Sequence, residues 1–133
     1  MSNRNTEAFT EIKVGDKESV FEGTLFDHRK PIKFLIHGFQ QNYESEFPQQ
    51  VKNVYLEHTD YNIICVDWGA LSTPRARHIA SVLYPLVVDN VPRVGEKVAD
   101  FIVYLRSNDF TSSLNLVHII GFSLGMNSII FRI

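Results

Sequence analysis

Three short segments of the chain are apolar at nearly every position. They cover residues 32–36, 61–66 and 114–120, and glycines at positions 38, 69 and 121 follow them. Each segment is rich in β-branched and aromatic residues, which is typical of strands. Because the apolar residues run almost without interruption, we expect strands covered on both faces, as in a parallel sheet.

Apolar residues at helical spacing lie between these strands. Between the first two strands, the i, i+4, i+7, i+8 positions are Phe47, Val51, Val54 and Tyr55. Between the second and third, a longer stripe comprises Val87, Val91, Val94, Val98, Phe101, Ile102 and Leu105. Either this helix begins around Asn90 with Pro92 in its first turn, or it is kinked at Pro92. A further short helix is expected over residues 75–84.

The alternation of strands and helices predicts one α/β domain over residues 1–133, with about four parallel strands and right-handed crossovers. Residues 1–18 are polar and form a weakly structured lead-in, with a hint of a strand at Phe9, Ile12 and Val14. Ligand sites of such sheets lie at the carboxyl ends of the strands.

Composition narrows the class of protein. The chain has 133 residues, and 13 Lys and Arg against 15 Asp and Glu give a net charge of −2, which argues against nucleic-acid binding. A hydrophobic fraction of 44% argues against disorder. The single Cys65 excludes an internal disulfide and a cysteine-rich zinc site. No segment is long and apolar enough to predict a transmembrane helix or a signal peptide. The oligomeric state stays open.

The sequence Gly121-Phe122-Ser123-Leu124-Gly125 matches the Gly-x-Ser-x-Gly nucleophile elbow. In this motif the serine occupies a strained turn between a strand and a helix, and small residues on either side let neighbouring elements pass close to it. The alternative is a chance turn after a strand. The apolar strand before the motif favours the elbow, with a helix that begins at Leu124 and directs its positive end at the serine.

Two further motifs end the other strands. In His37-Gly38-Phe39, the glycine allows the backbone to aim the Phe39 N–H at the site, as an oxyanion donor beside the Leu124 N–H. We expect the His37 side chain to order this loop. Asp67 can orient a catalytic base, but we favour a loop-capping aspartate above a packed Trp68, because the triad order in elbow hydrolases is serine, acid, histidine.

Together these segments resemble the pancreatic-type (animal neutral) lipases, and most closely the insect members, which include lipases and phospholipases A1. The resemblance spans roughly residues 20–125. It rests on the oxyanion segment at 31–39, the following strand at 62–68, the helix at 94–102 and the elbow strand at 117–125.

The resemblance implies a partial α/β-hydrolase fold and a secreted enzyme without a cofactor or metal, acting at a lipid–water interface. Ser123 is then the nucleophile on a carboxylic ester of a glyceride or a phospholipid, and the Phe39 and Leu124 N–H groups hold the oxyanion. Which of the two lipid classes is the substrate stays open.

The family places the acid and the histidine well downstream of the elbow. Here eight residues follow Gly125, none of them Asp, Glu or His, and all five histidines precede Ser123. We therefore expect a chain truncated just after the elbow, without a triad acid or histidine and inactive alone, since Ser123 without a base is a weak nucleophile. The competing hypothesis is a non-catalytic lipase-fold protein that binds a lipid or another ligand.

Overall fold

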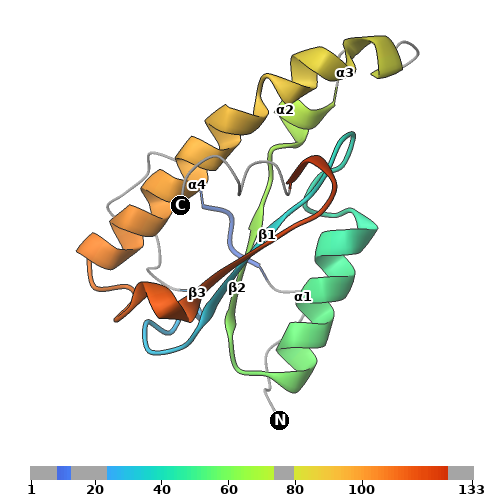
Figure 1. The fold of residues 1–133 in the computed structure, drawn as a ribbon. Helices are drawn as coiled ribbons and strands as arrows, with labels where there is room; N and C mark the ends of the chain where they lie inside the picture. Colours follow the sequence, from blue (N-terminus) through green and yellow to red (C-terminus); the bar gives the residue numbers. More distant parts are fainter. Residues whose placement is uncertain (1–8, 13–23, 74–79, 126–133) are drawn as a thin grey trace.

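The structure is a computed structural model, and it describes residues 9–12, 24–73 and 80–125. Its centre is a sheet of three parallel strands, β1 (Ile32–Ile36), β2 (Asn62–Val66) and β3 (Val117–Gly121), in the order β2-β1-β3 (Figure 1). The predicted α/β class with a parallel sheet and flanking helices is confirmed. The expected number of about four strands is wrong for the described residues, which form three.

The third strand begins later than predicted. Residues Leu114–Leu116 form a short 3-10 helix, and only Val117 starts β3. The cause is local, because the Ser113 side chain caps this turn by accepting the Asn115 N–H at 3.2 Å. Side chains of this kind offer the backbone an alternative to strand pairing.

Four helices occur in the described residues: α1 (Glu46–His58), α2 (Gly69–Ser72), α3 (Ala80–Val88) and α4 (Val91–Ser107). The first and last confirm the two predicted helices, although Val87 of the second predicted stripe lies in α3 and not in α4. The helix expected over 75–84 corresponds in part to α3, while residues 74–79 lie outside the described residues. Of the two alternatives for Pro92, the structure shows the first, with Asn90 as N-cap and the proline in the opening turn of α4.

The helices α1 and α4 lie on opposite sides of the sheet (Figure 1). Successive strand residues point to opposite faces, so Ile32, Phe34 and Ile36 of β1 enter the core with apolar residues of α4. The ring of Phe34 meets that of Phe101 edge to face, with centroids 6.1 Å apart. This face therefore carries the main hydrophobic core.

The face under α1 is more polar. Lys33 of β1 lies there, with its ammonium group 5.7 Å from the Tyr55 ring centroid and 5.0 Å from that of Tyr61. The stripe predicted for α1 is wrong at Val54, whose side chain is 58% exposed. Val54 lies about 100° around the helix from Tyr55, so it turns toward solvent when Tyr55 turns toward the sheet.

The lead-in is described only over residues 9–12, which form no strand. Phe9 packs its ring 5.6 Å from that of Tyr43, and Val14 lies outside the described residues. Among the helices described, none is long and apolar enough to cross a membrane.

Candidate active site

The carboxyl ends of β1 and β3 meet at one edge of the sheet, which brings the two predicted site segments together. Ile36 is in register with Gly121, and the next residue, Phe122, donates its N–H to the Ile36 carbonyl at 3.0 Å. This bond fixes the start of the elbow against the end of β1. Ser123 therefore follows directly beside the loop that begins at His37.

Ser123 has the strained backbone that the elbow motif requires. Its φ angle is 54°, in the left-handed region that a residue with a β-carbon rarely adopts. Its side chain is exposed, while Leu124 and Gly125 after it are buried and helical. Strain of this type persists only where surrounding contacts enforce it, and it is concentrated at functional sites.

Two glycines allow the approach of the elbow to the loop after β1. A β-carbon on Gly38 would lie 2.8 Å from the Ser123 β-carbon, and one on Gly125 would lie 2.4 Å from the Ile36 carbonyl oxygen. Both distances are too short for real atoms. The expectation that small residues let neighbouring elements pass close to the serine is therefore confirmed for Gly125.

The loop after His37 is held by hydrogen bonds to its own residues and to α2. Gly38 donates its N–H to Gln41 Oε1 at 2.8 Å, and Gln40 donates its N–H to the Ser72 carbonyl at 2.9 Å. The Phe39 N–H between them donates to no other residue in the part of the chain that the structure describes. An N–H group without a partner among these residues can donate to an oxyanion.

The His37 side chain orders the loop, as predicted. It is fully buried and stacks on Trp68, with ring centroids 5.5 Å apart. Its Nε2 accepts the Trp68 N–H at 3.1 Å, so the ring proton is on Nδ1, which donates to the Gly38 carbonyl at 3.1 Å. Burial lowers the pKa of His37, and the Gly38 bond and Asp67 carboxylate oppose this shift only in part.

The second motif also has the structural role that we favoured. Asp67 Oδ1 accepts the Gly69 N–H at 2.9 Å and so caps the start of α2. Trp68 is buried beneath it and donates its indole N–H to the His37 carbonyl at 2.8 Å. Asp67 Oδ1 lies 3.3 Å from His37 Nε2, but the ring already uses that nitrogen to accept the Trp68 N–H.

Aromatic rings flank the site on two sides. Phe122 stacks on Phe47 of α1, with centroids 4.9 Å apart, and remains 44% exposed. Phe39 meets Tyr84 of α3 edge to face at 5.0 Å. Tyr84 was not predicted as a site residue, and neither were Gln41 and Ser72, because the sequence carries no motif that connects them to the elbow.

No histidine or carboxylate of the described residues is hydrogen-bonded to the Ser123 hydroxyl. The nearest histidine in sequence, His118, instead lies with Nδ1 3.1 Å from Lys33 Nζ. The search of the described residues also finds no group of three or more acidic, histidine or cysteine side chains suited to a metal. The described site thus consists of an exposed serine on a strained turn beside the loop that carries the Phe39 N–H.

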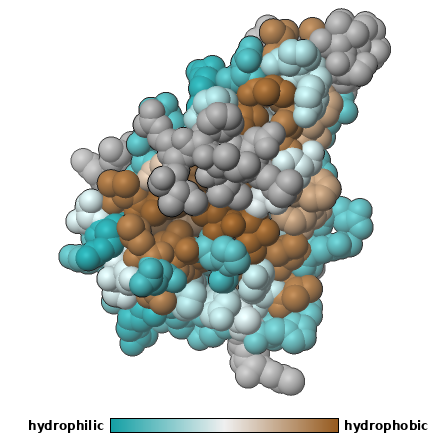
Figure 2. All heavy atoms as spheres, in the orientation of Figure 1, coloured by the Kyte–Doolittle hydropathy of each residue, from teal (hydrophilic) through white to brown (hydrophobic). Residues whose placement is uncertain are grey.

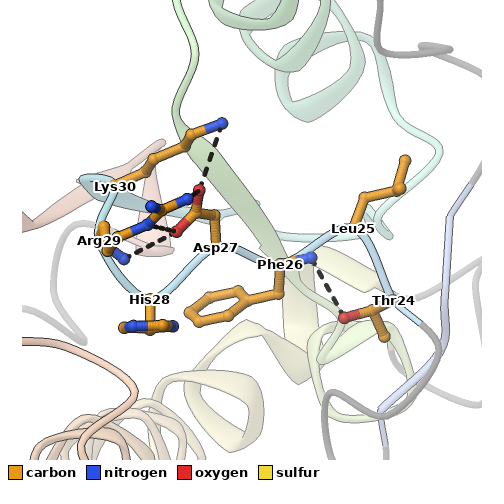
Figure 3. Close-up of a pocket in the computed structure, with 7 residues that line it drawn as sticks. All are labelled: Thr24, Leu25, Phe26, Asp27, His28, Arg29 and Lys30. Atoms are coloured by element: carbon orange, nitrogen blue, oxygen red, sulfur yellow. Dashed lines mark hydrogen bonds and ion pairs between the residues drawn. The ribbon is translucent and has the colours of Figure 1, made fainter.

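A hollow bounded by residues 24–30 lies away from this site (Figure 3). These residues precede β1, whereas Ser123 follows the opposite, carboxyl ends of the strands. The charges of the hollow are paired, since Asp27 binds Arg29 at 3.0 Å and Lys30 also reaches Asp60. The buried Asn62 side chain fixes the Asp27 backbone from β2. The hollow therefore lies over a turn that is braced by these ion pairs and by Asn62.

Comparison with known proteins agrees with this geometry. The chain is 31% identical to human pancreatic lipase-related protein 2 and 32% identical to human pancreatic triacylglycerol lipase, each over 127 residues and 96% of this chain. It is 33% identical to human lipoprotein lipase over 105 residues, or 77% of the chain. The chain spans 20–25% of the length of these relatives. The sequence model of the lipase family matches residues 1–128, which include the lead-in, and the chain therefore belongs to the lipase family.

Proposed function

We propose that this chain supplies the nucleophile and the oxyanion donors of a hydrolase that cleaves carboxylic esters of lipids. The observation that carries the proposal is the left-handed turn at Ser123 beside Gly38. A binding protein has no need of an exposed serine on a strained turn, whereas a nucleophile must stand clear of its own backbone. Membership of the lipase family gives the class of reaction.

In the proposed reaction, Ser123 Oγ attacks the carbonyl carbon of the ester and its proton passes to a base. The N–H groups of Phe39 and Leu124 stabilise the negative oxygen of the tetrahedral intermediate. The base returns this proton to the alcohol as the bond to it breaks, and a water that the base deprotonates then hydrolyses the acyl-serine, which releases the fatty acid and restores the serine hydroxyl. Loss of one such donor lowers turnover by about 100–1000-fold in other hydrolases.

The base is the part of the reaction that the described residues do not supply. A serine without a base is a poor nucleophile near neutral pH. Hydrolases whose triad is broken keep a rate enhancement of only about 10³–10⁴-fold over water. We therefore expect the 133-residue chain alone to turn over esters slowly.

The aromatic surroundings support an apolar substrate. The rings of Phe39, Tyr84, Phe47 and Phe122 stand beside the two strand ends that carry the site. Hydrophobic side chains also gather on the surface where α3 meets the start of α4 (Figure 2), and Leu86 there is 62% exposed. This fits a lipid ester, either a triacylglycerol or a phospholipid, met at a lipid–water interface.

A second candidate is a non-catalytic protein of the same fold that binds a lipid or another ligand. The observation in its favour is that Ser123 has no histidine partner among the described residues. One relative is named as inactive, the mouse inactive pancreatic lipase-related protein 1, which is 31% identical over 93% of this chain and 24% of its own length.

Hydrolysis of p-nitrophenyl butyrate separates the two candidates. The purified chain is compared with Ser123→Ala and with Ser112→Ala, which removes an exposed hydroxyl outside the site. The hydrolase proposal expects a loss of turnover in Ser123→Ala alone. Equal rates for all three proteins, together with binding of phospholipid vesicles by all three, would instead support the non-catalytic candidate.

A further inference from the structure

The backbone on both sides of Phe39 is fixed by other residues. Before it, the Gly38 carbonyl accepts the Nδ1 proton of His37 at 3.1 Å and the Gln41 N–H at 3.4 Å. After it, the Gln40 N–H is bound to Ser72 at 2.9 Å. A peptide group is planar and trans, so its N–H points away from its carbonyl. Holding the Gly38 carbonyl therefore also sets the direction of the Phe39 N–H.

Gln41 binds Gly38 twice. Its backbone N–H reaches the Gly38 carbonyl, and its side-chain oxygen accepts the Gly38 N–H at 2.8 Å. Only the oxygen of a carboxamide can accept this bond, so the orientation of the Gln41 amide is fixed by chemistry. Both peptide groups of Gly38, the residue in contact with Ser123, are thus held by one glutamine.

Gln41 is itself anchored to α2. Ser72 is fully buried, and its hydroxyl donates to the Gln41 carbonyl at 3.0 Å. The same residue offers its carbonyl to the Gln40 N–H, so two bonds join the end of α2 to the loop. The loop is therefore held between α2 on one side and the elbow on the other.

We propose that Gln41 is a positioning residue for the oxyanion donor at Phe39, a role that rests on the proposed ester hydrolysis. Its side chain keeps the Gly38 N–H occupied and holds the turn closed, so that the Phe39 N–H is aimed before a substrate arrives. A donor fixed in advance stabilises a developing oxyanion without reorganising during the reaction.

Backbone ¹⁵N NMR of Gln41→Met and Gln41→Glu tests this role. Methionine keeps the length of the side chain without an acceptor, whereas glutamate keeps the acceptor. In Gln41→Met, Gly38 amide exchange should accelerate about tenfold or more, and the Phe39 order parameter should fall from about 0.85 toward 0.6. Gln41→Glu should keep both values, and amides of β1 should be unchanged in both variants.

Two outcomes would overturn the proposal. One is a Phe39 order parameter and N–H dipolar coupling that stay unchanged in Gln41→Met although Gly38 exchanges faster. The other is equal disturbance in Gln41→Glu and Gln41→Met, which would indicate loss of packing alone. If Gln41→Met does not fold, Ser72→Ala replaces it, because it removes the hydroxyl that anchors Gln41 and should loosen Gly38 and Phe39 together.

Turnover provides a separate readout. Where hydrolysis depends on Ser123, Gln41→Met should lower kcat by about tenfold with KM unchanged, because the oxyanion develops only after the substrate has bound. If turnover does not depend on Ser123, the proposed function is wrong. If the Phe39 order parameter and dipolar coupling are unchanged in Gln41→Met, the proposed role of Gln41 is wrong. The two failures are therefore distinguishable.

Discussion

The β-carbon of Ser123 lies 2.8 Å from the point that a β-carbon on Gly38 would occupy. A methyl group at this position therefore cannot be added without moving the serine or the loop. The same holds for Gly125, where the atom in the way is the Ile36 backbone carbonyl oxygen at 2.4 Å. The space around Ser123 is thus set by two glycines far apart in the sequence.

These contacts predict a graded series of alanine substitutions. Gly125→Ala should lower the free energy of unfolding most and Gly38→Ala less, by about 1–3 kcal/mol for overpacking of this type. Gly69→Ala should cost least, because its closest contact is the exposed Asp67 side chain at 3.0 Å. Urea unfolding measures the series, and a larger loss in Gly69→Ala than in Gly125→Ala would contradict it.

The core under α4 predicts a large effect from one truncation. Leu105 is fully buried with the apolar residues of β1, whereas Val103 on the same helix is 63% exposed. Leu105→Ala should lower the free energy of unfolding by about 2–5 kcal/mol, because it removes apolar contacts and leaves a cavity. Val103→Ala is the control and should change it by less than about 0.5 kcal/mol.

The buried His37 predicts that stability falls in mild acid. Burial lowers its pKa in the folded state, so the unfolded chain binds a proton first as the pH falls below about 6.5. The contribution of the neutral His37 ring to the free energy of unfolding is therefore present in full above that pH. It is lost below that pH, at no more than about 1.4 kcal/mol per pH unit.

NMR titration of the His37 ring measures this directly. The ring should stay neutral in the folded protein at pH 6.5. His37→Asn should be less stable at pH 7.5 and should lose less stability between pH 7.5 and 5.5 than the unchanged chain. A ring that titrates at or above its ordinary pKa would contradict the prediction.

The thiol of Cys65 should react slowly in the folded chain. Burial raises its pKa to about 11, and Lys52 lowers it only in part. The thiolate is the reactive form, so at pH 8 labelling by a disulfide reagent should be about 100-fold slower than in urea. Equal rates in both states would show that β2 does not protect the thiol.

The edge of β3 predicts self-association of this chain. In the described residues β3 pairs only with β1, on one side. An unpaired strand edge is a template for pairing with another molecule. Light scattering over a dilution series should show mass that rises with concentration, whereas a monomer at all concentrations with a cooperative melting transition would contradict the prediction.

The sequence predicted the strands β1 and β2 correctly because each is a short apolar run followed by a glycine, and Pro31 also marks the start of β1. It placed the start of the third strand too early because Leu114 and Leu116 are apolar although Ser113 caps a turn there. A hydrophobic pattern does not show that the side-chain cap of a turn can prevent the same residues from pairing as a strand. It also did not show that Val54 faces solvent, because the adjacent residues Val54 and Tyr55 both fit the helical spacing although only one of them can turn toward the sheet.

The elbow could be predicted because all its requirements lie within five consecutive residues. Gln41 and Ser72 could not, because they are 31 positions apart and meet only through the placement of α2. The role of His37 in the loop was predicted from its position at a strand end. Its stack on Trp68 required the register of β1 and β2.

The strand order has a consequence for how the chain folds. The central strand β1 pairs with β3, whose His118 lies 85 positions after Lys33, so a long loop must close before the two strands meet. Contacts between distant segments form late and slowly, because the entropy of loop closure is lost before they contribute. An intermediate with only β1 and β2 paired would therefore have the loop at Phe39 in place without Ser123 beside it, and the site would be completed only when β3 pairs with β1.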